Sequence, residues 1–232
     1  MLILFDIDMT LVETDHIGID LLRDAGRSLF DPSFCIDGIS FGGCLDPVII
    51  AQMLVQNRVE PTQKNIRSMR TRYHQGLKSE AAKSPIARPL PGALELVEAC
   101  RSHPDIGAIG LLTGNYQETG TIKLQSAGFD TDVFLVNAWG DDSPHPEPLR
   151  SHLPPVAIEN FRTSNSNTIE PEQVVIIGDT VHDVRCAIEN SCRVLAVATG
   201  HASAHELRDA GADMVVEDLS DTVGILEWMT PI

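Results

Sequence analysis

The sequence predicts an α/β protein with a parallel sheet, because short apolar runs alternate with helical patterns along most of the chain. The apolar runs have the length and composition of buried strands. They lie at residues 2–5, 106–112, 133–136, 174–177 and 194–198. Apolar residues recur at helical spacing over residues 94–100, 121–127 and 184–190, which lie between or after these runs. Strands joined by helices in this way are typical of a parallel sheet covered on its faces.

The stretch from residue 15 to residue 85 departs from this alternation. It has helical spacing at residues 17–29 and 48–55, a polar, basic pattern at residues 63–83, and no convincing strand. A segment with three prolines follows at residues 84–92 and is typical of a connection that ends a helix. We therefore predict a helical insertion at residues 15–85 between two parts of one core, residues 1–14 and 86–232.

Charge and hydropathy exclude several classes of partner. The chain has 33 acidic residues against 17 lysines and arginines, a formal charge of −16, which argues against binding to nucleic acid or to an anionic membrane. It contains no apolar stretch long enough to span a bilayer and no export signal at its N-terminus. We expect a soluble cytoplasmic protein that meets any anionic substrate locally.

Polar residues follow three of the predicted strands at the point where each apolar run ends. FDIDMTL places Asp6 and Asp8 after the first run, LLTGN places Thr113 after the second, and IIGDTVHD places Asp179 after the fourth. Ligands of an open parallel sheet bind outside the carboxyl ends of its strands, so we expect these segments to meet. Carboxylates as close as Asp6 and Asp8 need a cation or a bend of the chain to separate their charges. Mg²⁺ is the best candidate, because it binds through few carboxylates, waters and phosphate oxygens.

These segments, in this order, resemble the motifs of the haloacid dehalogenase (HAD) superfamily of phosphotransferases. FDIDMTL is similar to the DxDxT motif, LLTGN to the second motif and GDTVHD to the acidic fourth motif. The resemblance implies a Rossmann-like core with an inserted helical C1 cap, which residues 15–85 would form. GGCLDP at residues 42–47, PLPGALELV at 89–97 and IKLQSAGF at 122–129 look like the phosphoglycolate phosphatase-like branch.

The resemblance implies a Mg²⁺-dependent phosphatase that hydrolyses a small phosphorylated metabolite. Asp6 would be the nucleophile that forms an aspartyl phosphate, and Asp8 the acid and base. The Asp6 side chain, the Asp8 carbonyl oxygen and the Asp179 carboxylate would bind the metal, and Asp183 would hold a metal-bound water or the loop. The phosphate would be bound by Thr113, Gly114, Asn115 and Arg150.

Three residues depart from the family pattern. Met9 stands where the first motif usually has glycine, so the turn after Asp8 must tolerate a side chain. Arg150 is our choice for the cation that a lysine normally supplies in the third motif, since arginine keeps its charge and grips two phosphate oxygens. Cys44 replaces an arginine often seen in similar caps, which weakens the case for a carboxylate-bearing substrate such as phosphoglycolate.

Each candidate residue also has an ordinary structural interpretation. Thr113 and Asn115, taken alone, suit a turn, and Asp183 suits the first turn of a helix. Arg150 is alternatively a surface residue of a flexible loop. Lys123 is expected on the exposed surface of its helix.

Other functions stay open. A sugar-phosphate mutase of the β-phosphoglucomutase type keeps both aspartates of the first motif, and a phosphoacceptor signalling module without turnover also uses clustered acids and a cation. A catalytically idle scaffold is a third alternative. The sequence predicts neither the physiological substrate nor the oligomeric state.

Overall fold

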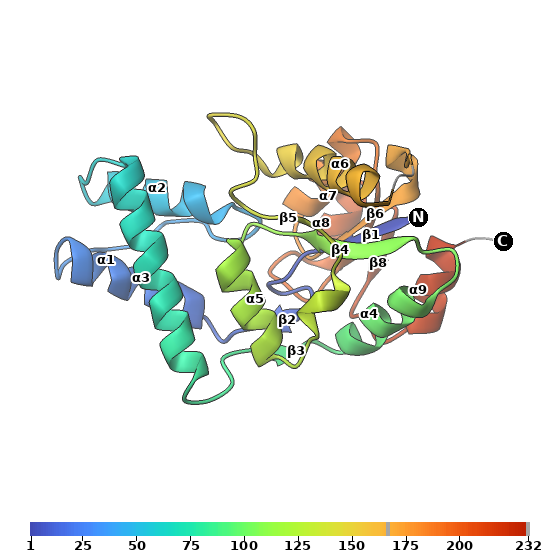
Figure 1. Ribbon diagram of the computed structural model, residues 1–232, viewed down its shortest axis with the longest axis horizontal. Coiled ribbons are helices and arrows are strands. Elements are labelled where there is room, and N and C mark those ends of the chain that lie inside the picture. The colour runs from blue at the N-terminus through green and yellow to red at the C-terminus, as the bar shows by residue number, and fades with distance from the viewer. Residues whose placement is uncertain (166–167, 231–232) are drawn as a thin grey trace.

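The computed structural model describes residues 1–165 and 168–230, in which a sheet flanked by helices lies beside a group of three helices (Figure 1). Strands of the sheet pair in the order β5-β4-β1-β6-β7-β8, and every neighbouring pair is parallel. The strands are β1 Leu2–Phe5, β4 Ala108–Leu112, β5 Val136–Ala138, β6 Val174–Gly178, β7 Arg193–Val197 and β8 Met214–Val216. The predicted α/β class with a parallel sheet is confirmed.

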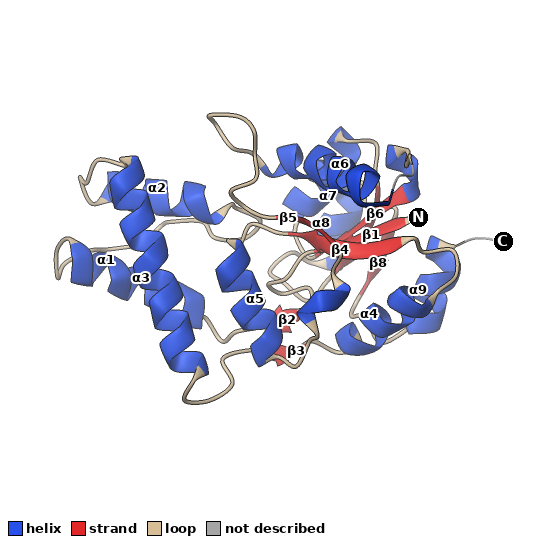
Figure 2. Ribbon diagram, in the orientation of Figure 1, coloured by secondary structure: helices blue, strands red, loops and turns tan. Residues whose placement is uncertain are grey.

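Helices cover both faces of the sheet (Figure 2). Side chains of β1 alternate between the faces: Ile3 and Phe5 pack with α4, α5 and α9, whereas Leu2 and Leu4 pack with α6, α7 and α8. These helices are α4 Ala93–Ser102, α5 Gln117–Ser126, α6 Leu153–Asn165, α7 Val181–Glu189, α8 Ala204–Asp209 and α9 Thr222–Met229. Because both faces are buried, the central strands have continuous apolar sequences, which made them recognisable.

One predicted strand is displaced. The apolar run at residues 133–136 was expected to form a strand, but Thr131–Val133 form the 3₁₀ helix η1 and β5 begins only at Val136. Phe134 is buried against Phe5, with ring centroids 6.4 Å apart, whereas the Leu135 side chain is 66% exposed. The apolar character of this run therefore reflects packing of a turn on the sheet and not strand pairing.

The stretch between residues 14 and 87 contains the three helices α1 Ile17–Leu29, α2 Asp46–Gln56 and α3 Gln63–Ala81. They share a hydrophobic cluster, which includes Leu22, Met53 and Leu77 and also Tyr116 from the start of α5. The chain enters this part through β2 Val12–Glu13 and leaves it through β3 Arg88–Pro89, and the two short strands pair antiparallel. The division at residues 15–85 stays a prediction; we refer to α1, α2, α3 and their loops as the helical part.

In the described residues, 1–165 and 168–230, no helix combines the length and the apolar character that crossing a bilayer requires.

Candidate active site

Loops that follow three adjacent strands form the candidate active site. Asp6 directly follows β1, Thr113 follows β4 and Asp179 follows β6. These strands are neighbours in the order β4-β1-β6 and run parallel, so their carboxyl ends lie at one edge of the sheet. The three segments that sequence analysis selected are therefore brought together.

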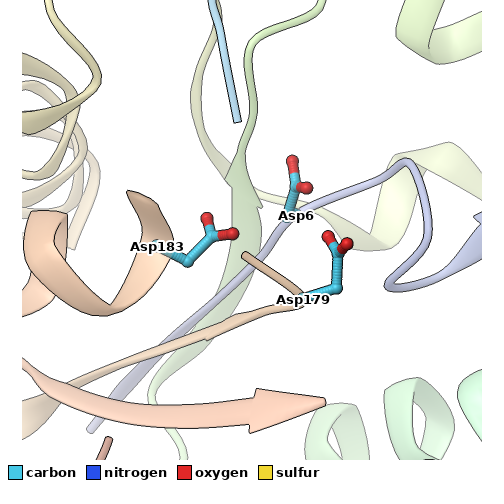
Figure 3. A group of neighbouring side chains, drawn as sticks. All are labelled: Asp6, Asp179 and Asp183. Atoms are coloured by element: carbon cyan, nitrogen blue, oxygen red, sulfur yellow. The ribbon is translucent and has the colours of Figure 1, made fainter. Parts of the chain in front are cut away.

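Asp6, Asp179 and Asp183 form a buried acidic cluster (Figure 3). One carboxylate oxygen from each lies within 4.8 Å of the others. Burial raises the pKa of Asp6 to about 6, assisted by the charges of Asp183 and Asp8 and opposed by Arg150. The pKa of Asp179 is also raised well above its usual value, first by burial and then by the charges of Asp183 and Asp6. Such a concentration of carboxylate oxygens fits a hard divalent cation such as Mg²⁺.

Arg150 lies inside this cluster and not on the surface. It belongs to the 3₁₀ helix η2 Arg150–His152, and its Nη2 lies 3.0 Å from Asp6 Oδ1 and 2.6 Å from Asp183 Oδ1. Burial opposes its charge, but Asp183 and Asp6 outweigh burial and raise the pKa of Arg150. Its buried Nε has no hydrogen-bond partner in the described part of the chain. The guanidinium therefore retains a donor for an anion beside Asp6.

Asp183 holds the loop before α7. Its Oδ2 accepts hydrogen bonds from the Thr180 backbone N–H at 3.0 Å and the Thr180 hydroxyl at 2.6 Å, while Thr180 Oγ1 accepts from the Asp183 N–H. This reciprocal arrangement is a capping box. The other oxygen faces Arg150, so Asp183 links the start of α7 to the acidic cluster.

The carboxylate of Asp8 turns away from Asp6. Lys123 Nζ lies 2.9 Å from Asp8 Oδ1 and 2.7 Å from Oδ2, and Asn115 Nδ2 donates to Oδ2 at 2.8 Å. The turn that follows Asp8 is tight, and Met9 has φ of 60° in it. This left-handed conformation costs about 1–2 kcal/mol for a residue other than glycine. The turn thus tolerates Met9 under strain.

Lys123 was expected on a helix surface, and that expectation is wrong. Only 5% of its area is exposed, and it shares the buried face of α5 with Thr119, Gly120 and Leu124. Residues four apart lie on one face of a helix, so the spacing of Lys123 from Thr119 was the signal that could have located it.

The polar groups of the loop after β4 mostly form hydrogen bonds within the protein. The hydroxyl of Thr113 accepts from the Asn115 side chain at 2.8 Å, and the Gly114 carbonyl accepts from the Asp46 N–H at 2.7 Å. A Cβ on Gly114 would lie 2.0 Å from the Cys44 carbonyl oxygen, so only glycine permits this close approach. Gly114 is thus a contact between the sheet and the helical part.

The loop at residues 42–46 covers the site from the helical part. A Cβ on Gly43 would lie 2.7 Å from His182 side-chain atoms. Burial raises the pKa of the Cys44 thiol, and the nearby Arg150 charge works in the opposite direction. Asp46 is buried and accepts from the Tyr116 N–H at 3.1 Å. The helical part therefore reaches both Arg150 and the start of α5.

Sequence reasoning also missed the segment after β7. The Thr199 hydroxyl donates to the Met9 carbonyl, and a Cβ on Gly200 would lie 1.8 Å from Asp179 Oδ2. Both residues follow the apolar run at 194–198, so the rule that selected the other three strand ends would have selected this one.

Comparison with known proteins gave matches at the level of family and fold. Residues 144–222 match the family model described as HAD-hydrolase-like. The search of curated protein sequences gave no match.

Three solved structures illustrate the similarity of fold. CbbY from Rhodobacter sphaeroides in complex with phosphate has a TM-score of 0.72 at 19% identity and covers 95% of each chain. A predicted phosphoglycolate phosphatase from Haemophilus somnus has a TM-score of 0.68 at 17% identity, covering 97% of each chain. A candidate β-phosphoglucomutase from Thermotoga maritima has a TM-score of 0.64 at 19% identity, covering 99% of each chain. At these identities the likeness concerns the fold.

Proposed function

From the match of residues 144–222 to a HAD-hydrolase-like family model and from the geometry of the site, we propose that the chain is a Mg²⁺-dependent phosphatase that hydrolyses a small phosphomonoester through an aspartyl phosphate on Asp6. The contrast between Asp6 and Asp8 carries the proposal. Asp6 lies in a buried acidic cluster beside Arg150, whereas Asp8, two residues on, lies against Lys123 and Asn115. One loop thus offers a carboxylate suited to attack beside a cation and a second suited to proton transfer.

The metal would be held by Asp6, Asp179 and the Asp8 carbonyl oxygen, with Asp183 beside them. When bound, Mg²⁺ neutralises the carboxylates and the phosphoryl oxygens, so that the anionic nucleophile and the anionic phosphate can approach. The excess of buried acid over the single cation Arg150 supports this role.

The chemistry needs two transfers of one phosphoryl group. An Asp6 oxygen attacks phosphorus, the bond to the ester oxygen breaks, and Asp8 gives its proton to the departing alkoxide. Asp8 then takes a proton from water, the water oxygen attacks phosphorus, and the bond to Asp6 breaks to release inorganic phosphate. Arg150 Nε and the loop 113–115 would bind the phosphoryl oxygens throughout.

The helical part would enclose the leaving group and exclude water. Its loop at residues 42–46 places Cys44 near Arg150. An arginine at position 44 would favour a carboxylate-bearing substrate, but this chain has cysteine there. We therefore propose that the enzyme belongs to the phosphoglycolate phosphatase-like branch and acts on a small phosphorylated metabolite in the cytoplasm. We do not assign phosphoglycolate as its substrate.

A mutase is the second candidate, since the chain also shares its fold with the Thermotoga maritima protein. Incubation with a hexose phosphate separates the two, because a mutase yields an isomer and a phosphatase yields inorganic phosphate. A signalling module without turnover would instead retain phosphate on Asp6 and release none.

The direct test measures phosphate release from p-nitrophenyl phosphate with Mg²⁺ and with EDTA. We expect turnover only with Mg²⁺, and a loss of at least about 1000-fold for Asp6→Asn, because the nucleophile is removed. Asp105→Asn is a matched control, since its side chain is 75% exposed. Full activity of Asp6→Asn, or equal activity in EDTA, would overturn the proposal.

A further inference from the structure

Lys123 is a buried ammonium group that joins the two parts of the protein. It lies on α5, yet its pKa depends on residues of both parts. Burial lowers the pKa of Lys123, but the negative charges of Asp8 and Asp46 outweigh burial and raise it. Asp46 comes from α2, and Tyr73 of α3 is also buried near Lys123. The ammonium therefore remains charged at the junction of the helical part with the sheet.

The contacts of Lys123 fix the orientation of one particular carboxylate. Its Nζ contacts both oxygens of Asp8, at 2.9 and 2.7 Å, and also lies 2.6 Å from Asn115 Oδ1. Asn115 in turn donates its Nδ2 to Asp8 Oδ2. Both oxygens of Asp8 are thus held, while 40% of the Asp8 side chain stays exposed. A carboxylate that is oriented but accessible suits a group that exchanges protons with a bound molecule.

Lys123 also gives Asp8 a counter-ion other than the one in the acidic cluster. Within that cluster, Asp6 and Asp183 already form ion pairs with Arg150. Without a positive charge beside it, Asp8 would keep the Asn115 amide as a partner but would have no counter-ion of its own. Lys123 supplies that charge, and it stabilises the carboxylate that remains once Asp8 has given up a proton.

We infer that Lys123 is a positioning residue that holds the Asp8 carboxylate toward the leaving-group oxygen and away from the acidic cluster. This inference rests on the proposed phosphatase function. Lys123 does not touch the reacting phosphoryl group; it acts through Asp8.

The test compares two esters that differ in their need for a proton. p-Nitrophenolate departs without protonation, whereas the alkoxide of glycerol 2-phosphate needs an acid. We expect Lys123→Met to lower kcat/KM for glycerol 2-phosphate by about 100-fold, the scale of general acid catalysis, and that for p-nitrophenyl phosphate by less than about 5-fold. Asp8→Asn should show the same selectivity, and adding Lys123→Met to it should cause little further loss.

Two further variants distinguish positioning from folding. Lys123→Arg keeps the positive charge and should restore much of the activity on glycerol 2-phosphate. Lys123→Gln keeps a donor without the charge, and serves as the second variant if Lys123→Met does not fold. Lys83→Met, at a side chain 63% exposed, is the matched control and should behave as wild type on both esters.

The outcomes separate this inference from the proposed function. A wild type that hydrolyses neither ester overturns the phosphatase function and the inference with it. An active wild type, together with equal losses on both esters in the folded Lys123 variants, leaves the phosphatase function standing and overturns the positioning role.

Discussion

The guanidinium of Arg70 lies on the ring of Tyr116, with its central carbon 3.9 Å from the ring centroid. Arg70 belongs to α3 of the helical part, and Tyr116 is the N-cap of α5 in the sheet part. Arg70 also forms two hydrogen bonds with Glu118, at 2.6 and 2.8 Å, and one with Asp141 at 2.6 Å. These contacts fasten the helical part over the site.

Removal of this contact should weaken the protein modestly. The groups are partly exposed, so we expect Arg70→Met to lower the free energy of unfolding by about 1–2 kcal/mol through lost ion pairs and lost stacking on Tyr116. Chemical denaturation of Arg70→Met, Glu118→Gln and the double variant measures the coupling, which should be about 0.5 kcal/mol or more and should shrink with salt. Arg72→Met, at an exposed position of α3, is the control. If the losses of unfolding free energy in the two single variants add up to that of the double variant, Arg70 and Glu118 are not coupled.

Magnesium should stabilise the folded protein without any substrate. The acidic cluster would bind a cation only when its three aspartates are held together in the folded state, so binding would add about 2.7 kcal/mol at 100 times the Kd. Thermal unfolding should therefore show a higher Tm in MgCl₂ than in EDTA. Asp179→Asn should lose this difference and Asp105→Asn should keep it. If MgCl₂ leaves the Tm of the wild type unchanged, the metal site is excluded.

The free energy of unfolding should depend on pH through Asp46. Burial raises the pKa of Asp46 to about 6, against the opposing charge of Lys123. The folded state therefore binds this proton more tightly than the unfolded state, and stability falls as pH rises from about 4 to about 6. A rise from 3.8 to about 6 corresponds to about 3 kcal/mol, which ionised Asp46 costs at pH 7.

Asp46→Asn removes this titration and retains an oxygen that can accept from the Tyr116 N–H. Denaturation curves between pH 4 and pH 7 should show a flatter dependence for Asp46→Asn than for the wild type. Asp37→Asn, in an exposed loop of the same part, should leave the slope unchanged. Identical slopes in the wild type and Asp46→Asn would refute the assignment.

Gly200 should control metal binding through Asp179. Its added Cβ would lie 1.8 Å from Asp179 Oδ2, a side-chain atom that can move aside, so Gly200→Ala should fold while displacing the carboxylate. We expect at least about a 10-fold weaker Mg²⁺ affinity by calorimetry, about 1.4 kcal/mol, with a smaller change of Tm in EDTA. Gly107→Ala is the control, because its Cβ would meet only ordinary contacts at 3.5 Å. Unchanged affinity in Gly200→Ala would show that Asp179 is not held by this contact.

Sequence patterns predicted the strands that are buried on both faces. β1, β4, β6 and β7 were recognisable because solvent reaches neither face, so their residues are almost all apolar. β8 was not identified, because Met214–Val216 is a short edge strand with only partial burial. The run at residues 133–136 was wrongly predicted to be a strand, since its apolar residues belong to a turn that packs on the sheet.

The sequence by itself determined the class of the fold and the acids of the candidate site. Alternating apolar runs and helical patterns require a covered parallel sheet, and residues that follow adjacent strands must meet at its carboxyl edge. Only the tertiary structure decided which cation each of these aspartates contacts. Asp6 contacts Arg150 and Asp8 contacts Lys123 because η2 brings Arg150 to the end of β1 and the buried face of α5 brings Lys123 to the loop after it. Those contacts join segments more than 100 residues apart, which no local pattern contains.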